Sequence, residues 1–497
     1  MFSIIQSATI IGVQSVPIQV EVDAANGLPQ ETIVGLADTV VRESKNRIRT
    51  AIKHAGFKYP LRHYTINLAP ANIKKEGPAL DLAIAAGILQ ATKQIPETPN
   101  ALFIGELSLN GDLQKMDGLI SILSNKKLCQ NKIIFIPKAN HYDMMLINNP
   151  NIIALDNLSD LKQYFMNELP QHQNKHLTLA NTRPDLDYAE VQGQDNAKRA
   201  LEIAVAGRHN ILLIGPPGSG KSMLLKRLRT ITPELSLQKS IEAYNIHTLG
   251  LKGSAVEPSL IPHCRAPHHS ISYAGMVGGG SKPKPGEISL AHHGILFLDE
   301  LPEFQRSVIE VLRQPLEDKE IAISRANMAI QYPADFMLVA TMNPCPCGYH
   351  TDPVRTCSCT PHQVSSYWKK ISGPILDRID MVVHVPRLSE DDLLNTTDHS
   401  DRESSSTILK RIQFARKIQE TRLHNDQQNS QLTQKQIKRH CKVQEQDKPI
   451  LKKAIQSGKL SGRSLSRLLK VSRTIADLNK DAELQATHLL EALSYRL

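Results

Sequence analysis

The sequence predicts an α/β protein of three domains. Its 497 residues suffice for about three domains of roughly 150 residues each, and 41% of them are hydrophobic, so each domain can form a core. Strand-like apolar runs alternate with helical stretches over most of the chain, whereas the C-terminal part is charged and helical in period. We expect an α/β domain at residues 1–168, a linker at 169–187, an α/β core at 188–388 and a helical domain at 389–497.

The first two domains differ in their strand patterns. The N-terminal domain contains runs such as IQVEV, HYTINLA, ALFIGEL and KIIFIP between helical stretches, which is typical of a compact mixed α/β fold. In the central domain the strands NILLIG, GILFLDE, FMLVATMN and MVVHVP are strongly apolar. Such strands are buried on both faces, so we expect a parallel sheet covered by helices on each side, an αβα core.

Composition argues against a membrane protein and against a disulfide scaffold. The N-terminus lacks the basic segment and cleavage site of a secretory signal, and no later apolar run approaches the roughly 20 residues that span a bilayer. Seven cysteines are too few for a disulfide framework here, whereas clustered thiols in a reducing compartment are more often metal ligands. We therefore expect a cytoplasmic protein that does not bind membranes.

The positive charge is concentrated near the C-terminus. The net charge is +10, and residues 404–475 contain seventeen Lys or Arg against four acids. A polyanion such as DNA is the natural partner for this stretch. A solvated helical surface could have the same composition, so charge alone leaves both interpretations open.

A phosphate-binding loop follows the strand NILLI and opens the helix SMLLKRLRTI, the context in which G-x-x-x-x-G-K-[ST] binds nucleotides. Glycines let backbone N–H groups surround phosphate oxygens, and the helix N-terminus adds its positive dipole end. We expect Lys221 to reach the β- and γ-phosphates of ATP and Ser222 to ligate Mg²⁺. The predicted loop comprises Gly215, Pro216, Pro217, Gly218, Ser219, Gly220, Lys221 and Ser222.

Two further strand ends and one later segment carry candidate catalytic groups. Asp299 and Glu300 follow ILFL, where one carboxylate can hold the Mg²⁺ shell and the other can polarise the attacking water. Asn343 ends FMLVATMN and is suited to orient that water, although it could simply cap the chain. Arg378 lies among acids, either as a surface ion pair or as a cation supplied to the transition state in a neighbouring subunit.

Four cysteines form a second candidate site. Cys345-x-Cys347 and Cys357-x-Cys359 are separated by nine residues that include Gly and Pro, so the loop can fold back on itself. Four thiolates can close a tetrahedral Zn²⁺ site, although C-x-C is tighter than the usual C-x₂-C and ordinary reduced thiols remain an alternative. We expect a structural zinc that braces the subunit contact.

Together these motifs resemble the AAA+ ATPases, specifically the magnesium-chelatase-like branch and its ComM/YifB group. The resemblance covers essentially the full length. Beyond the nucleotide motifs it rests on six segments: Arg265-Ala-Pro267-His268-His269-Ser270, Gly278-Gly-Gly280, Pro285-Gly286-Glu287-Ile-Ser289-Leu, His292-His293-Gly294, Asn343-Pro-Cys345-Pro-Cys347-Gly348 and Leu376-Asp-Arg378-Ile-Asp380.

The resemblance assigns roles and an assembly. It implies that Asn343 is sensor 1, that Arg378 is the arginine finger and that Arg463 is the sensor 2 arginine of an α-helical lid, although Arg467 lies one turn away. It also implies a homo-hexameric ring with ATP between subunits. Two pore-facing insertions would be residues 264–290 and the hairpin-like EIAISRANMAIQY.

The N-terminal domain resembles the Lon-protease type, an S5 domain 2-like α/β fold. Ala79 occupies the position of the nucleophilic serine and Ile120 that of the lysine, so we expect no covalent proteolysis. Scaffolding or DNA guidance is the better hypothesis. Candidate phosphate contacts, or else a solvated helix face, are Lys45, Arg47, Arg49, Lys53 and Lys58.

Two pairs of adjacent histidines, His268–His269 and His292–His293, could bind metal. Adjacent residues of a strand point to opposite faces, which favours structural or pore roles instead.

The resemblance favours an ATP-driven translocase or helicase, acting on single-stranded or branched DNA without sequence specificity. Its role would be branch migration during natural transformation, with recombination proteins as further partners. Two alternatives remain: a metal-insertion ATPase like magnesium chelatase, and a protein-remodelling ATPase. Stimulation of turnover by branched DNA, by a porphyrin with Mg²⁺ or by casein would separate the three.

Overall fold

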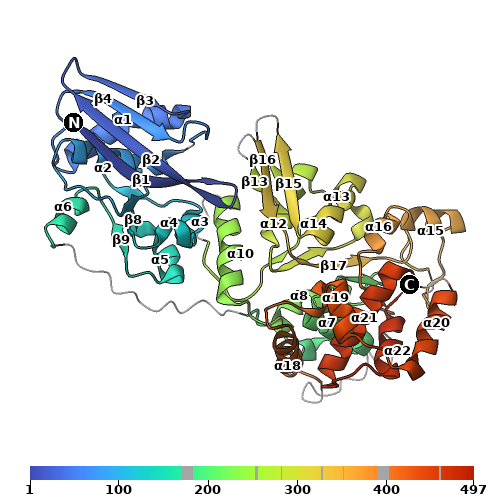
Figure 1. The fold of residues 1–497 in the computed structure, drawn as a ribbon. Coiled ribbons are helices and arrows are strands. Elements are labelled where there is room, and N and C mark those ends of the chain that lie inside the picture. Colours follow the sequence, from blue (N-terminus) through green and yellow to red (C-terminus); the bar gives the residue numbers. More distant parts are fainter. Residues whose placement is uncertain are drawn as a thin grey trace. The chain divides into compact units, whose positions relative to one another are not determined.

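The computed structural model describes residues 1–75, 77–168, 183–251, 256–280, 283–325, 328–350, 352–388, 402–457 and 460–496. The chain divides into two compact units (Figure 1). The N-terminal unit comprises Met1–Leu179 and Tyr244–Pro258, and the second unit comprises Ala180–Ala243 and Ser259–Leu497. Most of the expected linker, residues 169–182, lies outside the described part of the chain.

The N-terminal unit is built on a seven-stranded mixed sheet of order β3-β4-β2-β1-β5-β8-β9. Strands β1, β2 and β4 pair antiparallel, whereas β1, β5, β8 and β9 run parallel. The strands are β1 (Phe2–Ile11), β2 (Gln14–Ala25), β3 (Gln30–Val34), β4 (His63–Ala69), β5 (Ala101–Phe103), β8 (Ile133–Pro137) and β9 (Ile152–Leu155). A separate short ribbon joins β6 (Glu106–Leu107) and β7 (Leu113–Gln114).

Helix α2 (Asp81–Ala91) is buried along its whole length and packs on β1 and β2. The approach is close because Gly87 has no side chain: a Cβ there would lie 2.6 Å from Val22 Cγ2. Ser3 Oγ donates to the carbonyl of Gly87 at 2.8 Å and strengthens this contact. The other helices of the unit are α1 (Thr39–His54), α3 (Leu119–Leu123), α4 (Lys126–Cys129), α5 (His141–Ile147) and α6 (Asp160–Phe165).

The second unit contains the expected parallel sheet, of order β11-β14-β17-β10-β18. The strands are β10 (Ile211–Ile214), β11 (Cys264–Arg265), β14 (Ile295–Leu298), β17 (Met337–Met342) and β18 (Met381–His384). Because β14, β17 and β10 are neighbours, the three motifs that follow them meet at one edge of the sheet.

The C-terminal residues are helical, as their pattern predicted. The helices are α18 (Ser405–Leu423), α19 (Gln434–His440), α20 (Lys448–Gln456), α21 (Gly462–Leu478) and α22 (Ala486–Ser494). They share a hydrophobic core with α7 (Asp195–Gly207) and the sheet, to which α18 contributes Ile408 and Ile412 and α21 contributes Leu468 and Val471. Within the described residues, no helix combines the length and the apolar character needed to cross a membrane.

Candidate nucleotide-binding site

The loop between β10 and α8 (Lys221–Lys226) has the shape of a phosphate cradle. Gly218 and Gly220 have positive φ angles of 78° and 88°, and a Cβ at either position would meet no atom within 4 Å. The opposite holds for Gly215, where a Cβ would lie 2.2 Å from the carbonyl oxygen of Val385. The loop is therefore packed on the sheet at its start and open further along, so it fits a phosphate chain.

Lys221 lies at the centre of this loop. Its Nζ donates to the carbonyl oxygens of Gly215 and Pro216 at 2.7 and 2.9 Å and lies 3.5 Å from Asn343 Oδ1. Burial lowers the pKa of Lys221, while the nearby Asp299 and Glu300 raise it. The ammonium therefore binds the loop's own carbonyl groups, and phosphate oxygens could replace them as acceptors.

The two acids lie beside the loop, as their position after β14 predicted. Asp299 Oδ2 lies 3.4 Å from Ser222 Oγ. Ser222, Asp299 and Glu300 are all exposed, so the two predicted Mg²⁺ ligands and the candidate general base are accessible to solvent and to nucleotide. Hydroxyl and carboxylate oxygens are ligands that Mg²⁺ prefers, so this pair fits the ion.

One residue near the acids was missed by the sequence reasoning. The Thr341 side chain, which is fully buried on β17, hydrogen bonds with Asp299 Oδ1 and with the backbone N–H of Glu300. Threonine is a common strand residue, so its position before Asn343 gave no signal of this contact.

Arg378 makes no described contact with the phosphate loop of its own chain. Its guanidinium pairs with Glu317 of α14 (Arg313–Asp318) and donates to the carbonyl of Pro374 at 2.8 Å. Only 13% of the Arg378 side chain is exposed. Arg378 thus forms an ion pair within its own chain, which is one of the two roles that the sequence suggested.

The two arginines of α21 differ in their surroundings. Arg463 is exposed in the first turn of the helix. Arg467 lies 3.5 Å from Asp380, which in turn accepts the backbone N–H of Asn210 at 2.9 Å. Arg467 is thus engaged within the chain, which leaves Arg463 as the arginine of this pair that is accessible to a ligand.

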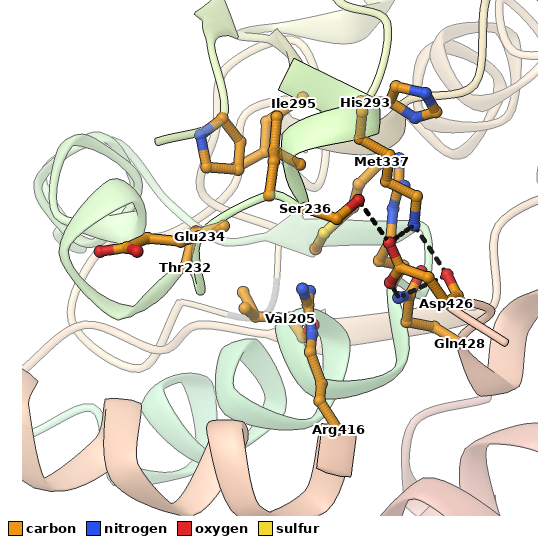
Figure 2. A pocket seen from close by; sticks show the side chains of 15 residues that line it. Val205, Thr232, Glu234, Ser236, His293, Ile295, Met337, Arg416, Asp426 and Gln428 are labelled. Carbon is orange, nitrogen blue, oxygen red and sulfur yellow. Dashed lines mark hydrogen bonds and ion pairs between the residues drawn. The ribbon is translucent and has the colours of Figure 1, made fainter. Parts of the chain in front are cut away.

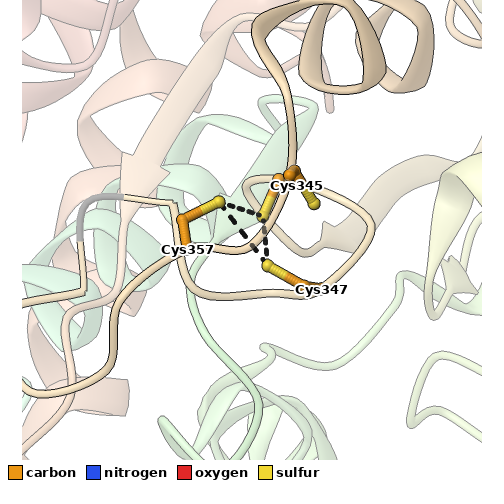
Figure 3. A group of neighbouring side chains, drawn as sticks. Cys345, Cys347 and Cys357 are labelled. Atoms are coloured by element: carbon orange, nitrogen blue, oxygen red, sulfur yellow. Dashed lines mark hydrogen bonds between the residues drawn. The ribbon is translucent and has the colours of Figure 1, made fainter.

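The four cysteines converge as their spacing predicted (Figure 3). Cys345 Sγ lies 3.3 Å from Cys347 and 3.7 Å from Cys357, and Cys347 and Cys357 are 3.5 Å apart. All four sulfurs lie within 4.8 Å of one another. Zn–S bonds of about 2.3 Å in a tetrahedron give S···S distances of roughly 3.8 Å, so the set fits Zn²⁺.

The cysteine loop also packs on the nucleotide loop, which its sequence position did not reveal. Gly348 has a φ of 87°, and a Cβ there would lie 2.6 Å from Pro217 Cδ. Trp368 Nε1 donates to the carbonyl of Pro344 at 3.1 Å and holds the start of the same loop. A metal in this loop would therefore support the shape of the phosphate cradle.

The expectation that adjacent histidines point apart is wrong for both pairs. The ring centroids are 4.0 Å apart in His268–His269 and 3.8 Å apart in His292–His293. His292 and His293 lie in the turn before β14 rather than in a strand, and His293 has a left-handed φ of 57°. Strand alternation therefore does not apply to them.

Both rings of the second pair face Glu242 of α10 (Leu237–Gly250). The Nε2 atoms of His293 and His292 lie 2.7 and 3.7 Å from the same Glu242 oxygen. The backbone N–H of Asp335 donates to His292 Nδ1 at 3.0 Å, so the proton of that neutral ring is on Nε2 and points toward Glu242. A metal would need that nitrogen's lone pair, so this cluster fits a carboxylate hydrogen-bonded by two imidazoles better than a metal site.

The pocket beside these histidines is polar, and an ion pair between Lys239 and Asp426 lies in its lining (Figure 2). Lys239 and Ser236 bind Asp426 at 3.0 and 2.9 Å, and Arg416 donates to the carbonyl of Val205 at 2.8 Å. None of its lining residues belongs to the phosphate loop. The pocket is therefore distinct from the candidate nucleotide site.

Each of the two segments expected to be pore insertions contains a short antiparallel pair of strands. β15 (Glu320–Arg325) and β16 (Met328–Pro333) pair antiparallel, while residues 326–327 at their turn lie outside the described chain. β12 (Gly278–Gly279) pairs with β13 (Lys284–Pro285). Arg265 donates twice to Glu287 of α12 (Glu287–Leu290), at 2.7 Å each, so these two motif residues join both ends of the segment 264–290.

The protease-like positions of the N-terminal unit carry no reactive group. Ala79 is half-buried in a short 3₁₀ turn, and Ile120 is fully buried in α3. Of the candidate phosphate contacts on or near α1, Arg47 is engaged with the buried Asp81 at 2.7 Å and Lys45 donates to the carbonyl of Glu31 at 3.2 Å. The remaining three are Arg49, which stacks over Tyr59, and the exposed Lys53 and Lys58.

Comparison with known proteins gives matches along nearly the whole chain. Residues 187–393 match the family model described as magnesium chelatase, subunit ChlI, and residues 402–496 match the model of its C-terminal part. Residues 20–140 match a third model, subunit ChlI of Mg-chelatase. The chain is 42% identical to the competence protein ComM of Haemophilus influenzae, covering 99% of this chain and 97% of that protein.

The chain belongs to the ComM/YifB family. A second member, the YifB protein of Escherichia coli, is 40% identical over the same shares of the two chains. The 38 kDa magnesium-chelatase subunit of Rhodobacter capsulatus is more distant, at 25% identity over 33% of this chain and 52% of that subunit. Within the magnesium-chelatase-like ATPases, this chain therefore groups with ComM/YifB rather than with the chelatase subunits over its full length.

Proposed function

We propose that this protein is a Mg²⁺-dependent ATPase that assembles into a hexameric ring and moves branched or single-stranded DNA during recombination. The observation that carries the ATPase is the convergence of three motifs at one sheet edge. Ser222 lies 3.4 Å from Asp299, and Lys221 lies 3.5 Å from Asn343. Lys221 would bind the β- and γ-phosphates, Ser222 and Asp299 would hold Mg²⁺, and Glu300 would polarise water.

The ring is supported by Arg378. Its contacts with Glu317 and Pro374 hold it away from the phosphate loop of the same chain, so it would serve the ATP site of an adjoining subunit. Arg463, exposed at the start of α21, would contact the nucleotide from the helical lid. Both roles place positive charge on a phosphoryl group in transfer, where it lowers the barrier most.

Two observations support DNA as the substrate: the name of a similar protein and the positive charge of the C-terminal helices. The relative that is 42% identical over 99% of this chain is named a competence protein. The basic helices of the C-terminal region carry the cations that would contact phosphates without reading sequence. Branch migration in natural transformation is the specific role that we propose.

Zn²⁺ is proposed as a structural cofactor. Cys345, Cys347, Cys357 and Cys359 would hold it, and through Gly348 the metal would stiffen the loop against Pro217. Bound zinc would supply folding energy and no reaction chemistry. Metal content by atomic absorption should be one zinc per chain, and it should fall on replacing Cys345 and Cys357 with serine.

A single assay distinguishes the candidate functions. ATP turnover is measured with forked DNA, a four-way junction, linear duplex and single-stranded DNA, and in parallel with casein or with porphyrin and Mg²⁺. We expect the junction or fork to stimulate turnover most and to be resolved into separate arms, with the Lys221→Ala protein inactive throughout. Stimulation by porphyrin or by casein, but not by DNA, would replace this proposal with metal insertion or protein remodelling.

A further inference from the structure

We propose that Thr341 is a positioning residue for ATP hydrolysis, which sets the orientation of both acids that follow β14. The proposal rests on the proposed ATPase activity and concerns a residue that lies outside the four motifs of the site. Its basis is one buried hydroxyl that contacts two successive residues, Asp299 and Glu300, from the neighbouring strand.

The sheet register brings the hydroxyl to the acids. Strands β14 and β17 run parallel with Leu298 opposite Ala340, so the next residues, Asp299 and Thr341, lie side by side at the ends of the two strands. Thr341 is fully buried, and a buried hydroxyl needs hydrogen-bond partners. Here both of its partners belong to the candidate catalytic acids.

The chemistry of the groups determines the direction of each hydrogen bond. An ionised carboxylate can only accept, so the Thr341 O–H donates to Asp299 Oδ1. A backbone N–H can only donate, so the same oxygen accepts from Glu300 N at 3.0 Å. One hydroxyl thereby fixes the side chain of Asp299 and the backbone of Glu300 together.

The bond to Asp299 divides its two oxygens between different tasks. Oδ1 is held by Thr341, while Oδ2 faces Ser222 Oγ at 3.4 Å. Oδ2 is thus directed toward the residue expected to ligate Mg²⁺. Losing the hydroxyl would free the carboxylate to rotate, which should weaken the site for Mg²⁺.

The bond to Glu300 holds an unfavourable backbone conformation. Glu300 has a φ of 53°, in the left-handed region that residues other than glycine rarely adopt. The chain turns at this residue from β14 into the 3₁₀ turn Leu301–Glu303, and this turn directs the Glu300 side chain. The hydrogen bond from Glu300 N to Thr341 stabilises the conformation, so Thr341 also positions the general base.

The test compares Thr341→Val with Thr341→Ser. Valine keeps the branched shape that suits a strand but removes both hydrogen bonds, whereas serine keeps the hydroxyl and loses a methyl group. A hydrogen bond to a charged group typically accounts for about a tenfold to a hundredfold change in an equilibrium or rate. We therefore expect Thr341→Val to lower kcat at least about tenfold and to raise the Mg²⁺ concentration for half-maximal turnover several-fold.

Three readouts distinguish positioning from packing. Affinity for ATP without Mg²⁺ should change less than about twofold in both variants, because the phosphate loop and Lys221 are untouched. Thr341→Ser should keep kcat and the Mg²⁺ requirement within about threefold of the natural protein. Tm and ring assembly are measured in parallel, and Thr341→Ala replaces the valine variant if the latter does not fold.

Two results would overturn the proposal. One is a folded Thr341→Val protein with unchanged kcat and Mg²⁺ requirement; the other is a folded Thr341→Ser protein as impaired as the valine variant, which would indicate a packing role. Absence of ATP hydrolysis by the natural protein would instead refute the proposed function, so the two failures are distinguishable.

Discussion

The two units of this chain both place helices on a sheet with parallel strands, yet they differ in the exposure of the acids that lie beside the sheet. In the N-terminal unit the acid at the start of α2, Asp81, is 1% exposed and bound to Arg47 at 2.7 Å. In the second unit Asp299 and Glu300 are both exposed beside an open glycine loop. A sheet edge becomes a candidate site only where its polar groups remain unburied.

Burial changes the chemistry of the same residue type. Burial raises the pKa of Asp81 to about 7, against the opposing effect of Arg47, and raises that of Asp143 to about 6. The two positions at which the resemblance would place a nucleophile and an amine hold the apolar Ala79 and Ile120. The candidate nucleotide-binding groups all lie in the second unit.

The largest effect should come from Arg378 of the second unit, the proposed arginine finger. Arg378→Ala should lower ATP turnover by about 10³-fold, since this cation would stabilise the transferring phosphoryl group. Turnover should partly recover when this variant is mixed with Lys221→Ala protein. At some subunit interfaces the Arg378→Ala subunit then supplies an intact phosphate loop and the Lys221→Ala subunit supplies an intact Arg378. A mixture no more active than either variant would exclude action between subunits, and Glu317→Gln serves as the control that removes only the ion pair of Arg378.

The next largest effect should be a loss of stability in the N-terminal unit that leaves ATP binding and turnover unchanged. Ile120→Lys buries an ammonium group at a fully buried position, and we expect a loss of about 3 kcal/mol in local stability. Hydrogen exchange of the amides of α3 should report this loss, while ATP affinity and turnover per site stay unchanged. Ala79→Ser is the matched control, with a change below about 1 kcal/mol because Ala79 is only half-buried. A fall in ATP turnover for Ile120→Lys would contradict the expectation that the nucleotide site of the second unit functions independently of this position in the N-terminal unit.

The third effect separates binding from hydrolysis within the second unit. Glu300→Gln should lower kcat by about 10²-fold, because an amide cannot accept a proton from water, and it should leave ATP bound. Stopped-flow binding and steady-state turnover measure the two steps. Multiple turnover at the natural rate would show that Glu300 is not the base.

The smallest effect is a pH response of opposite sign in the two units. Burial lowers the pKa of His292 to about 4, so the second unit should lose stability as the pH falls from about 6.5 toward 4, where the unfolded chain binds the proton more readily. Asp81 has a raised pKa, so the N-terminal unit should gain stability as the pH falls from about 7 toward 4. Between pH 7.5 and 5.5 we expect changes of about 1 kcal/mol in each direction, measured by hydrogen exchange of each unit. If the stability of both units changed in the same direction with pH, His292 and Asp81 would not be the groups that dominate the response.

Sequence reasoning was most successful where function depends on the ends of strands. The motifs at Gly215, Asp299 and Asn343 follow apolar runs that could be recognised directly, and parallel pairing brings such ends together. The cysteine spacing likewise predicted a cluster that the fold contains. The orientation of the histidine pairs was predicted wrongly, because strand alternation was applied to residues that form a turn.

The order of residues along the chain thus determines the nucleotide loop, the acids and the cysteine cluster, since each depends on residue type at short spacing. Other contacts depend on strand order and backbone direction: Thr341 with the acids, Arg378 with Glu317, and Gly348 with Pro217. The partners in these contacts are 42, 61 and 131 residues apart. Only folding decides which of many equally plausible side chains meet across such separations, because register and packing, rather than local composition, set the distance between them.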